Sequence, residues 1–191
     1  MIYIIRHGQT ELNQRQVLQG RSDFLLNDAG IRQAQQAAAA LSNVVFDHVF
    51  ASPLKRAVQT AQIIAPDVEP VIDDRLIEMD YGPYEGADLK ALPPEVLTFF
   101  SDFVHNPAPA GMESLASVVE RGGCFLEDVK NLHGNILIST HAIAMKGILE
   151  YLTPESNGAY WSEYIGNCAV YAVECTDGKI GIPKEWMRKE G

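Results

Sequence analysis

Short apolar runs alternate along the chain with stretches whose apolar residues recur at helical spacing. Residues 2–5 form a continuous apolar run, which is typical of a strand buried on both faces. Further short runs predict strands at residues 46–51, 68–72, 136–138, 168–174 and 179–182. Apolar positions at helical spacing predict helices over residues 27–41, 52–65, 113–132 and 142–152. Because strands alternate with helices, we expect an α/β fold.

This alternation further predicts three α/β/α layers around a mostly parallel central sheet. Pro70 places the 68–72 strand at a sheet edge, since proline cannot donate to a neighbouring strand. We expect Asn27 to cap one helix, and Ser52 to cap another with Pro53 in its first turn.

Residues 73–112 differ from this pattern, being rich in proline with one short apolar helix predicted at 95–104. We expect a single domain over residues 1–191, with a small helical lid inserted at about 73–112. The apolar side chains of that lid are expected to pack onto the core rather than contact a substrate.

The charge of the chain limits its partners. Fifteen basic and 25 acidic residues give a net charge of −10, so nucleic acid and anionic membranes are repelled at long range. No stretch approaches the roughly 20 apolar residues that span a bilayer, and the segment MIYIIRHG lacks the basic leader and small-residue cleavage site of a secretion signal. We therefore expect a cytoplasmic protein. The cysteines, histidines and acidic residues lack metal-ligand spacing, so no metal is expected.

Candidate functional residues follow the predicted strands, where α/β proteins bind ligands. Arg6 and His7 follow the first strand, Arg56 lies just after the second, and His141 follows the 136–138 strand. The loop after the third strand supplies Glu78. A lone histidine after a strand is usually structural, and a glutamate in a polar loop is usually solvated. Two histidines, two arginines and a carboxylate at one edge of an acidic protein instead indicate an anion site.

Phosphoryl transfer is the chemistry that fits this set. Arginine matches two phosphate oxygens with its planar fork, and a neutral imidazole can attack phosphorus. Neighbouring arginines should lower the pKa of that imidazole, and a carboxyl group can protonate the leaving oxygen and then activate water. The N-terminus of the helix after His141 would add amide donors. Motifs for a P-loop or a dinucleotide are absent, so no cofactor is expected.

Four blocks resemble those of the histidine phosphatase superfamily, also called the phosphoglycerate mutase-like superfamily. In chain order they are RHGQT at 6–10, SPLKRAVQTA at 52–61, LIEMDYGPYEG at 76–86 and STH at 139–141. The resemblance implies that His7 becomes phosphohistidine and that Glu78 is the general acid and then the base. The phosphate ligands that it implies are Arg6, Asn13, Arg56 and His141.

The fourth block departs from the family pattern at two positions. Ala142 stands where the family usually has glycine, and Lys146 where it usually has arginine. We expect the added methyl group to be tolerated and Lys146 to affect a supporting contact.

The resemblance allows a mutase or a phosphatase, and the charge of the lid favours one of them. Mutases hold a second charged group with basic residues here, whereas residues 87–110 contain one lysine and no arginine. This favours a metal-independent phosphomonoester hydrolase with a small-molecule substrate, similar to short bacterial broad-specificity and alpha-ribazole phosphatases. A cofactor-dependent phosphoglycerate mutase-type isomerase stays open, because Arg21 and Lys55 would add positive potential. A non-catalytic phospho-ligand-binding protein is the third interpretation, and the family allows a homodimer.

Overall fold

The computed structural model describes residues 1–176 and 179–187, and its centre is a six-stranded sheet. The strand order is β3-β2-β4-β1-β5-β8. The strands are β1 (Ile2–Arg6), β2 (His48–Ala51), β3 (Val71–Ile72), β4 (Ile136–Thr140), β5 (Val170–Val173) and β8 (Lys184–Met187). Strands β1 to β4 pair in parallel, while β5 runs antiparallel to both of its neighbours. The predicted mostly parallel sheet, with β3 at its edge, is confirmed.

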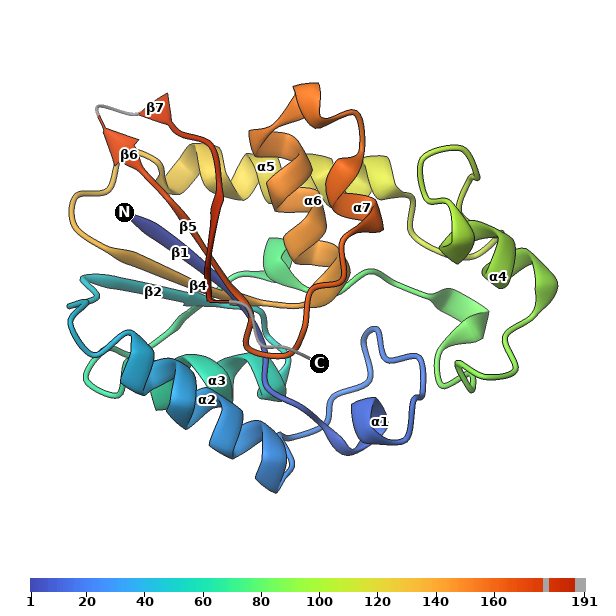
Figure 1. Cartoon of the computed structure of the whole chain (residues 1–191), viewed down its shortest axis with the longest axis horizontal. Helices are drawn as coiled ribbons and strands as arrows, with labels where there is room; N and C mark the ends of the chain where they lie inside the picture. Colours follow the sequence, from blue (N-terminus) through green and yellow to red (C-terminus); the bar gives the residue numbers. More distant parts are fainter. Residues whose placement is uncertain (177–178, 188–191) are drawn as a thin grey trace.

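Helices cover both faces of the sheet (Figure 1). On one face lie α2 (Asp28–Ala40) and α3 (Lys55–Ile64), and on the other lie α5 (Leu115–Val129) and α6 (Ala142–Leu152). Three shorter helices are α1 (Glu11–Gln14), α4 (Pro94–Ser101) and α7 (Ala159–Ser162). Single 3-10 turns are η1 (Asp74–Leu76), η2 (Gly82–Tyr84) and η3 (Pro154–Ser156). The three predicted layers are therefore present.

Strand β1 is buried on both faces, as its apolar run predicts. Tyr3 and Ile5 pack in the cluster under α2 and α3. Ile2 and Ile4 pack in the cluster under α5 and α6. Successive side chains of a strand point to opposite faces, so one strand contributes to both layers of the core.

Helix α3 begins later than predicted, and Ser52 does not cap it. Its N-cap residue is Leu54, which has no side-chain capping bond. The Lys55 amide instead donates to Asp23 Oδ1 at 2.7 Å, so a distant loop satisfies this end of the helix. Ser52 is thereby left to bond with a histidine ring, described below.

The C-terminal strands also differ from the prediction. β7 (Lys179–Ile180) pairs only with β6 (Cys175–Thr176), in a separate two-stranded sheet. The last strand of the main sheet is β8, which the apolar pattern misses because Lys184 and Glu185 are polar and exposed at the edge. Trp186 anchors this strand through an edge-on contact with Tyr3, with ring centroids 5.5 Å apart.

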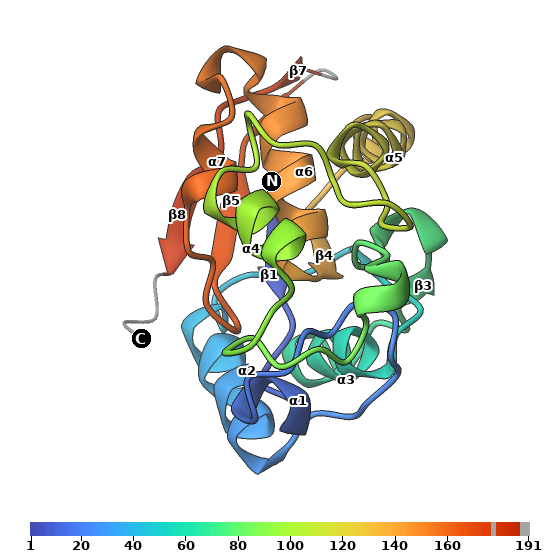
Figure 2. The same ribbon diagram turned by 90° about the vertical axis from the view of Figure 1, so that its right-hand side faces the viewer.

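The 73–112 segment lies beyond the carboxyl ends of the parallel strands, and α4 faces the viewer there in Figure 2. Val96 and Phe99 of α4 are buried in a third apolar cluster that also contains Trp161. Phe103 joins Phe99 to Trp161, with ring centroids 4.8 and 6.2 Å away. These contacts confirm the predicted packing for Val96 and the three phenylalanines Phe99, Phe100 and Phe103. Leu97 and Val104 do not follow it, being 51% and 48% exposed.

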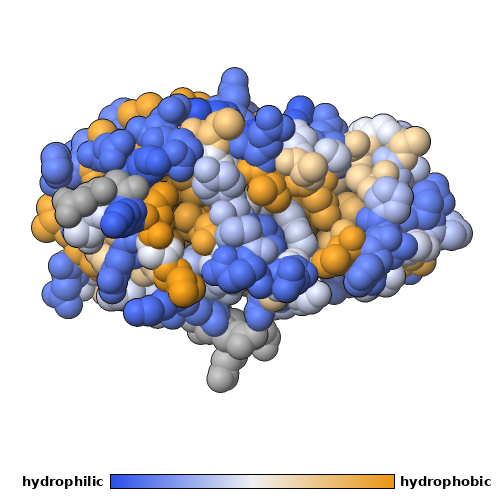
Figure 3. Space-filling model, turned by 90° about the horizontal axis from the view of Figure 1, so that it is seen from above, coloured by the Kyte–Doolittle hydropathy of each residue, from blue (hydrophilic) through white to orange (hydrophobic). Residues whose placement is uncertain are grey.

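The surface above α5 and α6 is largely hydrophilic, and apolar residues show between the polar ones (Figure 3). Among the helices of the described ranges, none has the length and apolar character needed to cross a membrane.

Candidate active site

The predicted site residues meet at the carboxyl ends of β1 and β4. Arg6 ends β1, and His141 follows β4 as the N-cap residue of α6. The His7 amide donates to the Thr140 carbonyl at 2.9 Å, which joins the two strand ends. The Gly8 amide donates to Thr60 Oγ1 at 3.1 Å and so fixes the β1 loop against α3.

His7 is held as a neutral imidazole, and its hydrogen bonds show which ring nitrogen carries the proton. Its ring is 3% exposed, and Nδ1 lies 2.7 Å from the Gly8 carbonyl. A carbonyl only accepts, so Nδ1 carries the proton and Nε2 is the basic atom. Arg56 Nε donates to Nε2 at 3.2 Å. Burial, with the charges of Arg56 and Arg6, holds the pKa of His7 well below its usual value.

Arg56 is fully buried and firmly oriented. Its Nη1 donates to the Ser22 carbonyl and its Nη2 to the Gly20 carbonyl, each at 2.6 Å. With the bond from Nε to His7, three of its five N–H groups are bonded, which leaves one on each Nη for a ligand. Burial lowers the pKa of Arg56 to about 10, and the nearby carboxylates of Glu78 and Glu85 oppose this. Backbone carbonyls therefore provide the direct oxygen contacts of Arg56, and the two carboxylates act on it through their charge.

Arg6 and His141 each keep one buried nitrogen without a partner. Arg6 Nη1 donates to the Ile165 carbonyl at 2.5 Å, and His141 Nε2 lies 2.7 Å from Ser52 Oγ. Arg6 Nε and His141 Nδ1 are the two fully buried side-chain N/O atoms of the described ranges that have no hydrogen-bond partner. The ring of His141 lies 5.0 Å from that of His7, centroid to centroid. Buried polar atoms are normally bonded, so this pair marks a place for a polar ligand.

Both of these residues are affected by their burial. Burial is the main cause that lowers the pKa of Arg6, and the charge of Glu78 opposes it. Burial, assisted by the charge of Arg56, lowers the pKa of His141 well below its usual value. The site thus has two guanidinium groups and two neutral imidazoles.

Glu78 is buried at the start of α6. Its Oε1 accepts from the amides of Met79 and Ala144 at 2.9 and 3.0 Å, and Oε2 accepts from the Ile143 amide at 3.2 Å. This corrects one expectation, because the first amides of α6 hold this carboxylate and are not free for a ligand. The charge of Glu78 is the largest of those that raise the pKa of Arg6 and of Arg56 against the effect of burial.

Asn13 lies beside the His7 loop. Its Oδ1 accepts from the Thr10 amide at 3.1 Å, within the capping box of α1. Asn167 Nδ2 lies 3.4 Å from the same oxygen and donates to the His7 carbonyl at 3.0 Å. The oxygen of Asn13 is therefore committed to the backbone.

Lys146 makes the supporting contact that was expected of it. Its Nζ donates to the Trp161 carbonyl at 2.8 Å and lies 5.4 Å from the Phe103 ring centroid. Burial lowers its pKa to about 8. The residue joins α6 to α7 and to the 73–112 segment.

The sequence interpretation missed Glu85 and the loop that it holds. Glu85 accepts hydrogen bonds from Gly20 and Ser22, the residues whose carbonyls hold Arg56. Glu85 lies at the end of the third block, and this position could have marked it as a candidate. The contact itself joins residues more than 60 positions apart, which spacing cannot reveal.

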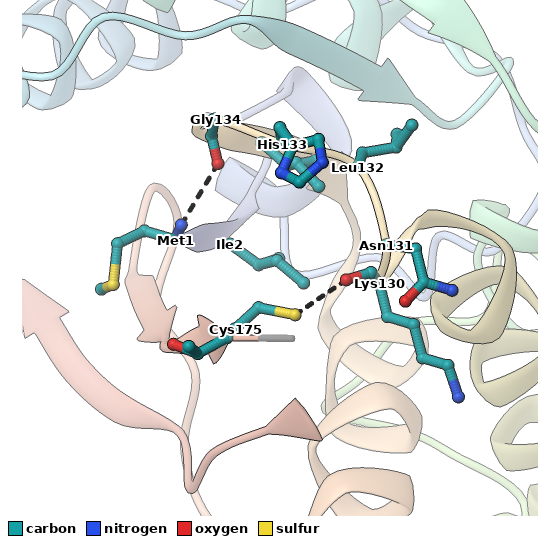
Figure 4. A pocket seen from close by; sticks show the side chains of 10 residues that line it. Met1, Ile2, Lys130, Asn131, Leu132, His133, Gly134 and Cys175 are labelled. Carbon is teal, nitrogen blue, oxygen red and sulfur yellow. Dashed lines mark hydrogen bonds between the residues drawn. The ribbon is translucent and has the colours of Figure 1, made fainter. Parts of the chain in front are cut away.

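A cavity of about 500 Å³ lies at the opposite ends of the strands (Figure 4). Met1, Ile2 and Ile136, at the amino ends of β1 and β4, help to line it. Two of its polar groups are bonded internally: the Met1 ammonium donates to the Gly134 carbonyl, and Cys175 Sγ donates to the Lys130 carbonyl. Ligands of such sheets bind at the carboxyl ends, so this cavity is not the site predicted from the sequence.

Within residues 1–176 and 179–187, no three His, Cys, Asp or Glu side chains come close enough to hold a metal ion. The candidate site therefore consists of the two guanidinium groups, the two imidazoles and Glu78.

The two buried imidazoles predict how stability depends on pH. In the unfolded chain His7 and His141 take up protons near pH 6.5, whereas in the folded protein their lowered pKa keeps them neutral. The unfolded state then binds more protons, so the free energy of unfolding falls as the pH drops below 6.5. The expected slope is at most about 1.4 kcal/mol per pH unit for each imidazole.

Urea unfolding at several pH values in this range measures that slope. His141→Asn is expected to remove about half of it. A free energy of unfolding that stays constant would contradict the buried neutral state of both rings.

Comparison with known proteins agrees with the blocks found in the sequence. A model of the histidine phosphatase superfamily (branch 1) matches residues 2–185. Putative phosphoserine phosphatase 2 of Hydrogenobacter thermophilus is 34% identical over 179 residues, covering 90% of this chain and 88% of that protein. Phosphoglycerate mutase-like protein 4 of Arabidopsis thaliana is 33% identical over 195 residues, covering 97% of this chain and 84% of that protein.

A solved structure shows the same similarity in three dimensions. A phosphoserine phosphatase of Entamoeba histolytica, in complex with phosphoserine, matches with a TM-score of 0.82 at 28% identity. The match covers 94% of this chain and 92% of the other. The chain belongs to branch 1 of the histidine phosphatase superfamily.

Proposed function

We propose that the protein is a metal-independent phosphomonoester hydrolase that works through a phosphohistidine at His7. The observation that carries this proposal is the pair of buried, unpartnered nitrogens, Arg6 Nε and His141 Nδ1, beside a neutral His7. Ser52 Oγ accepts from the Leu54 amide and can donate its own proton to Nε2 of His141, so the neutral ring carries its proton on Nδ1. Arg6 Nε and His141 Nδ1 are then both donors to which phosphate oxygens can bond, and the two guanidinium groups balance the phosphate charge.

The first chemical step transfers the phosphoryl group to the enzyme. Nε2 of His7 attacks phosphorus, the bond from phosphorus to the ester oxygen breaks, and Glu78 protonates the departing alcohol. The Gly8 carbonyl, 2.7 Å from Nδ1, supports the positive charge that develops on the ring. Arg6, Arg56 and His141 donate to the phosphoryl oxygens, where negative charge increases in the transition state, and Asn13 contributes through its amide nitrogen.

The second step returns His7 to its starting state. Glu78, now a carboxylate, removes a proton from water, which attacks phosphorus and breaks the bond to Nε2. Inorganic phosphate leaves, and the proton that Glu78 takes from water replaces the one that it gave to the alcohol.

Hydrolysis is favoured over isomerisation by the pairing of the extra cations. Arg21 pairs with two carboxylates: Nη1 lies 3.1 Å from Asp80 Oδ2, and Nη2 lies 3.6 Å from Glu113 Oε2. Lys55 Nζ lies 3.3 Å from Asp23 Oδ2. Their charge is therefore largely offset by adjacent carboxylates. A second anionic group on the substrate would receive little support from either of them.

An assay in the presence of a chelator tests this function. We expect phosphate release from p-nitrophenyl phosphate and from a panel containing phosphoserine, alpha-ribazole phosphate and 3-phosphoglycerate, with no 2-phosphoglycerate formed. The panel ranks phosphoserine, the substrate in the names of several relatives, against the other esters. Rapid formation of 2-phosphoglycerate that 2,3-bisphosphoglycerate stimulates would instead establish a mutase.

The proposal includes the location, the domain organisation and the type of substrate of the enzyme. We place the enzyme in the cytoplasm as one domain, with residues 73–112 as its lid and a small molecule as its substrate. The net charge of −10 supports a small molecule, rather than nucleic acid or an anionic membrane, as the partner of the protein. Light scattering of the pure protein tests for the homodimer that the family allows.

A further inference from the structure

We infer that Glu85 is a positioning residue of the active site, which fixes the phosphate-binding guanidinium of Arg56 through the loop of residues 20–22. This inference rests on the proposed function, because its value to the enzyme depends on Arg56 binding a phosphoryl group. Within residues 1–176 and 179–187, the hydrogen bonds of Glu85 go to Gly20 and Ser22, and none joins it to His7, Arg56 or another proposed catalytic side chain.

The carboxylate of Glu85 organises one side of the 20–22 loop. Both of its oxygens lie 3.0 Å from the Gly20 amide. Oε1 also accepts from the Ser22 amide at 3.1 Å and from Ser22 Oγ at 2.5 Å. Three donors of the loop therefore converge on one side chain from the 73–112 segment.

The opposite side of the same loop organises Arg56. The carbonyls of Gly20 and Ser22 accept from Nη2 and Nη1, each at 2.6 Å. The two residues that donate to Glu85 are thus the two that accept from Arg56. The guanidinium plane is fixed at both Nη atoms, and Nε then points to Nε2 of His7 at 3.2 Å.

Two further features show that the loop is fitted closely to Glu85. A Cβ atom added at Gly20 would lie 2.7 Å from Glu85 Oε2 and 2.7 Å from the Met79 carbonyl, so only glycine allows this approach. Backbone bonds join the segments on either side: Leu18 donates to the Ala87 carbonyl at 2.8 Å, and Gly86 donates to the Leu18 carbonyl at 2.9 Å.

The negative charge of Glu85 stabilises the Arg56 guanidinium, in addition to the hydrogen bonds made through the loop. After burial, which lowers the pKa of Arg56, the charges of Glu78 and then Glu85 raise it. Glu85 therefore supports the guanidinium through space as well as through the loop. Asp23 adds to this effect, and Glu85 is distinguished from it by its bonds to Gly20 and Ser22, whose carbonyls hold Arg56.

The change Glu85→Gln tests this role with little change of volume. An amide has one acceptor oxygen and an NH₂ group, which would face the N–H groups of the loop. We expect kcat/KM for p-nitrophenyl phosphate to fall about 10-fold or more, because buried donors are left unpaired and Arg56 loses its fixed orientation. The affinity for orthovanadate, measured by inhibition or calorimetry, should fall in parallel.

Ser22→Ala provides a milder variant in case Glu85→Gln folds poorly. It removes one bond to Glu85 and keeps both carbonyls that hold Arg56, so a smaller decrease in the same direction is expected. Glu95→Gln is the matched control, since Glu95 lies in the same segment and its hydrogen bond within the described part of the chain is an exposed one, from the Tyr84 hydroxyl at 3.2 Å. The control should retain the wild-type kcat/KM.

A double-mutant cycle separates positioning from general stability. If Glu85 acts through Arg56, then Glu85→Gln should add little further loss of orthovanadate affinity in an Arg56→Ala background. Full additivity, or a Glu85→Gln variant with wild-type kcat/KM and orthovanadate affinity, would overturn the inference. Because calorimetry needs no turnover, a wild-type protein that binds orthovanadate without hydrolysing esters would refute the proposed function alone.

Discussion

Substitution of His7 by alanine is expected to reduce kcat by at least about 10³-fold, because the covalent step loses its nucleophile. His7 is the neutral imidazole whose Nε2 faces Arg56, and no other described group combines these properties. Stopped-flow or discontinuous phosphate release with p-nitrophenyl phosphate measures this change. The remaining rate reports what Arg6, Arg56 and His141 achieve by binding alone.

The same variant should keep its affinity for inorganic phosphate within a few-fold, because the guanidinium groups and His141 remain. Calorimetric titration with phosphate is the control for the integrity of the site. A His7→Ala enzyme that turns over at the wild-type rate would remove His7 from the mechanism.

The change Glu78→Gln is expected to have the second largest effect, and the effect should depend on the leaving group. A phosphate ester of a simple alcohol needs a proton on its leaving oxygen, so its kcat/KM should fall about 10²-fold or more. The leaving group of p-nitrophenyl phosphate departs as a stable phenolate, so its kcat/KM should fall far less. The parameter kcat/KM is the useful one because it excludes the later hydrolysis of the phosphoenzyme.

The carboxamide is also expected to lower stability, since one oxygen must replace two that accept from Met79, Ile143 and Ala144. Thermal unfolding of the variant measures that loss separately from catalysis. Equal decreases of kcat/KM for good and poor leaving groups would argue against Glu78 as the general acid.

The strand-end positions of Arg6, His7 and His141 could be predicted because they depend on a local pattern. An apolar run identifies a strand, and the residues after it must lie at the edge where parallel strands end. The two-faced burial of β1 follows from the same run. These features require no knowledge of what packs against them.

The errors concern groups whose partners lie far along the chain. Ser52 has the sequence features of a helix cap, yet it bonds to His141, and Asp23 takes over the amide of Lys55. The amides at the start of α6 are suited to an anion, and the anion that binds them is Glu78. Helix ends are satisfied by whichever acceptor the tertiary structure supplies.

Strand β8 was missed for a different reason. It is an exposed edge strand, so polar residues are compatible with it and the apolar pattern gives no signal. The contact between Trp186 and Tyr3 that anchors it is again tertiary.

The central claim is the covalent intermediate, and rapid acid-free quenching of the enzyme during turnover tests it most directly. The quenched protein is digested and its peptides are analysed by mass spectrometry. The account predicts an acid-labile phosphoryl group on the peptide that carries His7, formed from substrate and absent in His7→Ala. Turnover by the wild-type enzyme with no phosphopeptide under conditions that preserve phosphohistidine, or a phosphoryl group on another residue, would contradict it.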